Sequence, residues 1–259
     1  MSRPARVAGR AVLHAVLVGF AFVSIAPIAV IVSIALKTNT ELATNPLGPP
    51  EHWLFANFAE AWAEAGIGRY ILNSVIVVVP TLVLVIVVAS LAGYAFALLR
   101  FPGREVLFAV FLVGLTLPAV SIVIALSFIQ QGMGLFNTLP GLILAEAALC
   151  IPLAVFLMRA AFRDLPGELR EAVLVDGGTE VTSLVRVMFP LARPAVSAVT
   201  VLTFLTVWND YLLPLVLINT ESLRTIPLGL AFLKTAFTAD VVLIAASTTL
   251  AAIPSIVIY

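Results

Sequence analysis

The sequence predicts an all-α integral membrane protein with six transmembrane helices, and three observations lead to this fold class. Hydrophobic residues make up 62% of the 259 residues and charged residues only 11%, whereas a soluble domain is about 45–50% apolar. Several runs reach the roughly 20 apolar residues that a helix needs to cross a bilayer. Because a lipid-exposed backbone must satisfy its own hydrogen bonds, we expect these runs to be helices.

The six predicted spans follow one another along the chain, which we therefore expect to form a single transmembrane domain over residues 1–259. The spans are Ala11–Leu36, Tyr70–Leu99, Val106–Ile129, Leu139–Leu157, Ala195–Leu217 and Val241 to the end. The first is too long for a signal-peptide core, and no cleavage pattern of small residues follows it. The last run reaches Tyr259 without a basic flank. A chain-end carboxylate at that depth would be costly, so we expect a tail beyond this residue.

Basic residues give the predicted orientation. With the N-terminus inside, ten of the 14 lysines and arginines fall in inner segments, and the outer segments hold only Lys37, Arg69, Arg224 and Lys234. The inner set is Arg3, Arg6, Arg10, Arg100, Arg104, Arg159, Arg163, Arg170, Arg186 and Arg193. By the positive-inside rule, we expect a cytoplasmic N-terminus and a cytoplasmic polar stretch at about residues 160–194.

This polar stretch predicts two short helices joined by a sharp bend. Pro166 suits the start of the first helix, and Glu168 lies where the helix dipole favours a negative charge. Gly177 can adopt the left-handed conformation that ends a helix, and Thr179 can cap the next one. The second helix is expected to carry an apolar stripe of Val181, Leu184, Val185 and Met188. Two interpretations stay open: an interfacial linker resting on lipid, or a rigid knob presented to a cytoplasmic partner.

The residues of this stretch resemble the EAA loop of ABC importer permeases. The resemblance lies in one register over Glu171-Ala172-Val173, Asp176-Gly177, Phe189-Pro190 and Pro194. The family pattern has alanine where this chain has Val173, but the glutamate, the Asp-Gly pair and the prolines all fit.

Further segments resemble the permeases of carbohydrate importers, in particular the G-side permease of maltose-type systems. They are Asn73-Ser74, Ala92–Ala97, Arg100, Phe101–Arg104, Pro118, Asn137-Thr138, Trp208-Asn209-Asp210 and Thr225–Gly229. Gly93 stands where that branch usually has alanine.

The resemblance implies a type I ABC importer permease fold and a multi-pass subunit of the bacterial inner membrane. It implies a second permease, a dimeric cytoplasmic ATPase, an extracytoplasmic solute-binding protein and a sugar or related small polar solute as cargo. The implied ATPase-coupling residues are Glu168, Glu171, Ala172, Asp176 and Gly177, with Glu171 meeting a basic group on the ATPase. For Asp176 and Gly177, a purely structural role in the turn is equally open.

The chain itself is not expected to be an enzyme. It has no G-x-x-x-x-G-K-[ST] loop to cradle phosphates, so ATP and Mg²⁺ would belong to the partner ATPase, and no cofactor is expected here. The single Cys150 excludes an intramolecular disulfide and a multi-cysteine metal site, and His14 and His52 show no metal-site spacing. A net charge of zero gives no field for nucleic acid, which leaves lipid and protein as macromolecular partners.

Polar residues inside the spans are candidates for the substrate passage, because such groups are costly in a membrane and often line a route. They are Glu146, Asn209 and Asp210, with Trp208 and Tyr211 available to stack on a sugar ring. An alternative role for Asn209 and Asp210 is hydrogen bonding between helices that holds the bundle together.

Two further alternatives remain at this level. The outer segments Thr38–Gly68 and Asn219–Asp240 carry aromatic and acidic residues, which suit either docking of a binding protein or anchoring at the membrane interface. A rival function is a self-contained secondary transporter or channel with Glu146 or Asp210 as its ion site. The absence of paired repeat halves speaks against it. Nothing in the sequence selects one sugar.

Overall fold

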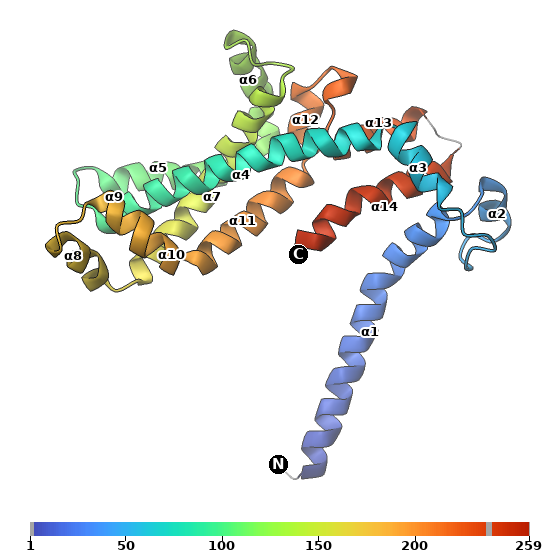
Figure 1. The fold of residues 1–259 in the computed structure, drawn as a ribbon, viewed down its shortest axis with the longest axis horizontal. Helices are drawn as coiled ribbons and strands as arrows, with labels where there is room; N and C mark the ends of the chain where they lie inside the picture. The colour runs from blue at the N-terminus through green and yellow to red at the C-terminus, as the bar shows by residue number, and fades with distance from the viewer. Residues whose placement is uncertain (1–2, 237–239, 259) are drawn as a thin grey trace. The chain divides into compact units, whose positions relative to one another are not determined.

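The computed structural model of the chain describes residues 3–236 and 240–258, and every regular element in them is a helix (Figure 1). The helices of the first half are α1 (Arg3–Ala35), α2 (Asn39–Thr44), α3 (Ala56–Ala63), α4 (Ile67–Leu98), α5 (Arg104–Thr116), α6 (Ala119–Gly132) and α7 (Leu139–Asp164). Those of the second half are α8 (Gly167–Val175), α9 (Glu180–Ser183), the π-helical turn η1 (Leu184–Met188), α10 (Phe189–Leu191), α11 (Arg193–Trp208), α12 (Leu212–Leu217), the 3₁₀ turn η2 (Glu221–Leu223), α13 (Ile226–Ala236) and α14 (Val241–Ile258). The side chains of Arg3, Arg6, Arg10 and Lys234, and the whole of Tyr259, lie outside the described residues.

Four of these helices are long and apolar enough to cross a membrane on their own: α1 from Leu13, α4, α7 and α14. Two bent pairs, α5 with α6 and the segment Glu180–Leu191 with α11, raise the number to six if each pair is one span. These lengths and compositions confirm the predicted class, a multi-span helical membrane protein.

The third predicted span, Val106–Ile129, is wrong as a single helix. The chain bends by 106° between α5 and α6, at Leu117 and Pro118 (Figure 1). Proline has no N–H to donate, and its ring disfavours helical geometry in the residue before it. Leu117 is accordingly extended, with φ −81° and ψ 115°.

The fifth predicted span, Ala195–Leu217, is also interrupted. Helix α11 ends at Trp208, and the short helix α12 begins at Leu212. Asp210 stabilises the break, because its Oδ1 accepts a hydrogen bond of 3.1 Å from the Leu212 N–H and its Oδ2 one of 3.0 Å from the Leu213 N–H. Such a side-chain cap satisfies N–H groups that the start of a helix leaves free.

The chain divides into two compact units, which are described separately. The first comprises Met1–Gly68 and Leu230–Pro254. Within it, α1 exposes most of its apolar side chains. Lys37 is fully buried at the end of α1, where its ammonium donates hydrogen bonds of 2.7 Å to the carbonyl oxygens of Asn45 and Gly48. These bonds hold the following loop against the helix end.

The second unit comprises Arg69–Gly229 and Ser255–Tyr259 and is organised around α7, which contacts α5, α6, α11 and α12. Helix α4 also crosses α7 closely at Gly93. A Cβ atom there would lie 2.7 Å from the Cβ atom of Met158 and 2.9 Å from the backbone nitrogen of Arg159. The absence of a side chain at Gly93 therefore permits this close approach.

Hydrogen bonds also join the start of α4 to the segment that leads into α13 in the same unit. The Asn73 side-chain amide donates hydrogen bonds of 2.9 Å to the carbonyl oxygens of Ser222 and Arg224, and the Ser74 hydroxyl accepts one of 2.9 Å from the Ile226 N–H. Two segments about 150 positions apart, each noticed separately in the sequence, are therefore joined at the start of α4.

Candidate functional site

The first half of the predicted coupling loop folds as the sequence indicates. Helix α8 is followed by Gly177 with a φ of +80°, the left-handed conformation that glycine adopts without steric cost. The N–H of Gly178 donates a hydrogen bond of 2.8 Å to the carbonyl of Val173, and the N–H of Gly177 one of 3.1 Å to that of Leu174. These bonds satisfy the last carbonyl groups of α8 and fix the bend.

The second half differs from the prediction in its internal geometry. Thr179 does cap α9, accepting a hydrogen bond of 3.2 Å from the Thr182 N–H, but the chain then passes through the π-helical turn η1 before α10. The predicted apolar stripe is therefore only half correct. Leu184 and Met188 are buried, whereas Val181 and Val185 are 67% and 60% exposed. The buried face is centred instead on Ser183, Leu184 and Met188, because the wider π turn changes which side chains face inward.

An ion pair and a hydrogen bond fix α8 to the rest of the unit. The guanidinium of Arg170 on α8 pairs with both carboxylate oxygens of Glu180 at the start of α9, with its Nε 2.9 Å from Oε2. This pairing raises the pKa of the Arg170 guanidinium above its ordinary value. The hydroxyl of Tyr94 on α4 donates a hydrogen bond of 2.6 Å to Oε2 of Glu180, and Tyr94 is only 3% exposed. Glu180 therefore links α8, α9 and α4.

All five predicted coupling residues lie on the exposed side of this fixed loop: Glu168, Glu171, Ala172, Asp176 and Gly177. Within the part of the chain that the structure describes, none of the three acidic members forms an ion pair. The loop therefore presents unpaired carboxylates on a helix whose position is set by Arg170, Glu180 and Tyr94.

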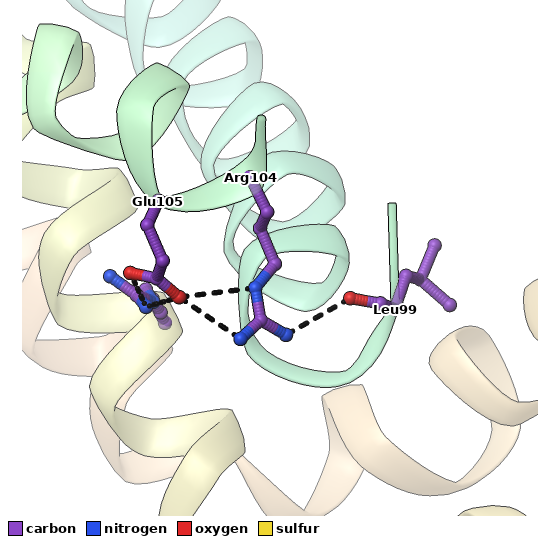
Figure 2. Close-up of polar contacts among 4 residues, drawn as sticks. Leu99, Arg104 and Glu105 are labelled. Atoms are coloured by element: carbon purple, nitrogen blue, oxygen red, sulfur yellow. Dashed lines mark hydrogen bonds and ion pairs between the residues drawn. The ribbon is translucent and has the colours of Figure 1, made fainter. Parts of the chain in front are cut away.

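The corner between α4 and α5 lies beside α8 and is fixed by its own polar contacts (Figure 2). Arg104 donates a hydrogen bond of 3.1 Å to the carbonyl of Leu99 and pairs with Glu105 at 2.9 Å. Nη2 of Arg159, on α7, lies 2.9 and 2.8 Å from the two carboxylate oxygens of Glu105. The Arg159 guanidinium also lies 3.7 Å from the ring centroid of Phe108.

Sequence reasoning found neither the Tyr94–Glu180 bond nor the Glu105–Arg159 pair. Their partners are separated by 86 and 54 positions, and no local pattern reveals contacts at such separations. The one available signal is that ionisable residues lie at the ends of long apolar runs. A fixed partner there lowers the free-energy cost of placing an ionisable group near the membrane.

Two of the predicted passage residues come together inside the second unit. Glu146 on α7 is 2% exposed, and its Oε1 has no hydrogen-bond partner among the described residues. Asp210, in the break between α11 and α12, interacts with Glu146 electrostatically. Two carboxyl groups therefore meet at the interruption of a membrane span.

The remaining passage candidates do not share one surface. Trp208 is buried and stacks on Phe204 with ring centroids 5.3 Å apart, whereas Tyr211 is exposed. The side-chain amide of Asn209 donates a hydrogen bond of 2.8 Å to the carbonyl of Leu205, one turn earlier. Their role in the passage stays a prediction. No group of three potential metal ligands occurs among the residues that the structure describes.

The outer segments also expose aromatic side chains. Trp53 and Trp62, in the first unit, both lie at the surface, and Trp53 stacks with Phe55 at a centroid distance of 6.4 Å. Nothing in these contacts selects between a docking face and an interfacial anchor, so both interpretations of the segment stay predictions.

Comparison with known proteins gives matches over most of the chain. Residues 86–259 match the family model described as "Binding-protein-dependent transport system inner membrane component". The chain is 41% identical over 211 residues to a diacetylchitobiose uptake system permease protein of Streptomyces coelicolor, covering 82% of this chain and 70% of the relative. It is 34% identical to a trehalose transport system permease protein of Mycobacterium tuberculosis, covering 85% and 79% respectively.

The fold is matched by a solved structure as well. A chain in the crystal structure of a bacterial ABC transporter involved in the import of the acidic polysaccharide alginate aligns with a TM-score of 0.84 at 23% identity. The alignment covers 100% of this chain and 96% of that chain. This match confirms the predicted permease fold.

Proposed function

Because the chain belongs to the family of inner membrane components of binding-protein-dependent transport systems, we propose that it is the permease subunit of an ATP-driven importer. In this proposal it pairs with a second permease to form the passage and receives its solute from an extracytoplasmic binding protein. The names of its relatives, which mention diacetylchitobiose and trehalose, support a sugar or a related small polar solute as cargo.

The proposed attachment point for the ATPase dimer is α8. One observation carries it: the Arg170–Glu180–Tyr94 contacts fix a short helix whose Glu168 and Glu171 are exposed and form no ion pair with the described residues. The excess of arginines in the same set of segments supports a cytoplasmic position for this loop and for the N-terminus. Glu171 would face a basic group of the ATPase, and such a pair fixes register and partner choice more than affinity. ATP and Mg²⁺ would bind the ATPase subunits.

The proposed passage runs near the junction of Glu146 and Asp210. A break in a membrane span is tolerated where the backbone lies in protein or faces a water-filled cavity. The Asp210 cap and the buried Glu146 carboxyl mark such a place in the second unit. We assign most of the solute contacts to the paired permease, as the family resemblance implies.

The test is retention of the ATPase by purified complexes that carry Glu171→Lys. We expect retention to fall at least about tenfold, which corresponds to about 1.4 kcal/mol of binding free energy, while the permease still inserts. Glu64→Lys, the same exchange at an exposed residue of the first unit, is the matched control. Normal retention and uptake with Glu171→Lys would defeat the assignment. Uptake driven by a pH gradient without ATP, by this chain alone in liposomes, would favour a secondary transporter instead.

A further inference from the structure

We infer that the ATPase binds a two-walled cleft in this chain, and that Arg100, on the wall opposite α8, accepts an acidic group of the ATPase. This inference rests on the proposed function and adds a second contact region, the α4–α5 corner, to the loop. It also predicts the charges on the ATPase surface: an acidic group that faces Arg100 and a basic group that faces Glu171.

The cleft is an open space of about 980 Å³ within the second unit. One wall is formed by the end of α4 and the corner that follows it, and the other by α8 and the start of α9. The lining residues are Ala97, Leu98, Leu99, Arg100, Phe101, Arg104, Gly167, Arg170, Glu171 and Glu180. Because Glu171 lines this space, a partner group that approaches its carboxylate from the cleft side also lies beside the corner.

Contacts within this chain hold both walls in place. Arg104, Glu105 and Arg159 fix the corner (Figure 2), and Arg170, Glu180 and Tyr94 fix α8. A preformed cleft reduces the ordering cost of association, so this arrangement suits a surface that must transmit movement.

Some charged residues of the cleft have an ion-pair partner within the described part of the chain, and others do not. Arg170 and Glu180 neutralise each other, and Arg104 is paired with Glu105. Arg100 and Glu171 are exposed, and neither forms an ion pair in the described part of the chain. Among the described residues, Arg100 on the corner and Glu171 on α8 are therefore the charged groups of the lining without an ion-pair partner.

This pattern favours a protein surface over a lipid headgroup as the occupant. A phosphate that approached Arg100 within the cleft would also meet the unpaired carboxylate of Glu171, and like charges placed together are unfavourable. The other two arginines of the lining, Arg104 and Arg170, already pair with Glu105 and Glu180. A protein segment can place an acidic side chain at Arg100 and a basic one at Glu171 at the same time. The ATPase subunit proposed to bind α8 is the partner already adjacent to this space.

The experiment uses the assembled importer in detergent and measures the ratio of ATPase to permease after washing at increasing salt. Arg100→Glu is compared with Arg186→Glu, the same exchange at an exposed arginine of η1 that does not line the cleft, and with Arg100→Lys. We expect Arg100→Glu to lower retention at least about tenfold, and Arg100→Lys and Arg186→Glu to retain most of the ATPase. The unfolding midpoint of the permease without ATPase should be unchanged in all three.

A second measurement identifies the occupant directly. Arg100→Cys carrying a photo-crosslinker should form a covalent product with the ATPase in the assembled complex. Equal retention by Arg100→Glu and Arg186→Glu, or crosslinks to phospholipid alone, would overturn the inference. If Glu171→Lys still releases the ATPase in that case, the proposed function stands without the second contact. If neither Glu171→Lys nor Arg100→Glu releases it, both proposals fail.

Discussion

The hydroxyl of Tyr94 and the carboxylate of Glu180 are joined by a hydrogen bond of 2.6 Å, although the two residues are 86 positions apart. Tyr94 belongs to the membrane-spanning helix α4, and Glu180 to the loop between α7 and α11. The loop is therefore attached to a third span besides the two that flank it in sequence. Movement of α8 would reach α4 through this carboxylate, which Arg170 also holds.

Tyr94→Phe is expected to weaken coupling while leaving the ATPase bound. The change removes the hydroxyl and leaves the Arg170–Glu180 pair in place. One hydrogen bond contributes about 0.5–1.5 kcal/mol, so the solute moved per ATP hydrolysed in proteoliposomes should fall about two- to tenfold. Tyr70→Phe removes the hydroxyl of another buried tyrosine of α4 and is the control. Unchanged stoichiometry with Tyr94→Phe would show that the bond does not transmit movement.

Gly177→Ala is expected to destabilise the bend through backbone conformation alone. No atom lies within 4 Å of the position of an added Cβ, but φ is +80°, and an L side chain there costs about 1–2 kcal/mol. We expect a lower unfolding midpoint and weaker ATPase retention, with a smaller effect for Gly177→Asn. Gly167→Ala, also in open space but without a positive φ, should not destabilise. Equal midpoints for the two alanine variants would contradict this account.

Gly93→Ala should lower the stability of the permease, although it adds only one methyl group. The added Cβ would meet the backbone nitrogen of Arg159 at 2.9 Å, and backbone cannot rotate away as a side-chain tip can. Overpacking of this kind costs about 1–3 kcal/mol. The thermal midpoint of the purified permease measures the effect, with Gly132→Ala, where no atom lies within 4 Å, as control. A midpoint equal to that of the control would mean that α4 shifts without cost.

Asp210 variants separate a structural role from an ion-carrying one. Asp210→Ala removes the cap from α12 and should cost about 0.5–2 kcal/mol, seen as a lower unfolding midpoint. Asp210→Asn keeps one of the two oxygen acceptors and loses the charge, so we expect an unfolding midpoint between those of the wild type and Asp210→Ala, with ATP-driven uptake retained. Loss of uptake in Asp210→Asn at such an intermediate midpoint would instead assign a charge-dependent step to this carboxyl.

Local signals in the sequence predicted much of the loop, whereas long-range contacts could not be predicted from it. Gly177 and Thr179 act on their immediate neighbours, so their cap roles are visible in the residue types. Pro118 entered the sequence analysis through the family resemblance, and the sequence does not reveal that the chain turns by 106° there. The break after Trp208 contains neither glycine nor proline, and its cap, Asp210, was identified only as a polar residue inside a span.

The sequence likewise predicted some residues of the candidate site and missed others. The family resemblance identified the exposed residues of α8, because those residues recur in one register. The contacts that hold α8 involve Tyr94 and Glu180, and a single sequence does not pair such distant positions. Arg100 was recognised as a basic flank of a span, and its place on a cleft wall became visible only when the corner and α8 were seen to share one space.

The buried ammonium of Lys37 has a practical consequence. Acylating reagents attack an amine that is deprotonated and accessible, and this one is enclosed and bonded to two carbonyl oxygens. An amine-reactive dye should leave Lys37 unmodified in the native permease and react with it once the loop of residues 45–48 detaches. The rate at which Lys37 is modified, measured by mass spectrometry of the peptide that contains it, would then report the rate at which this unit opens, without any engineered label.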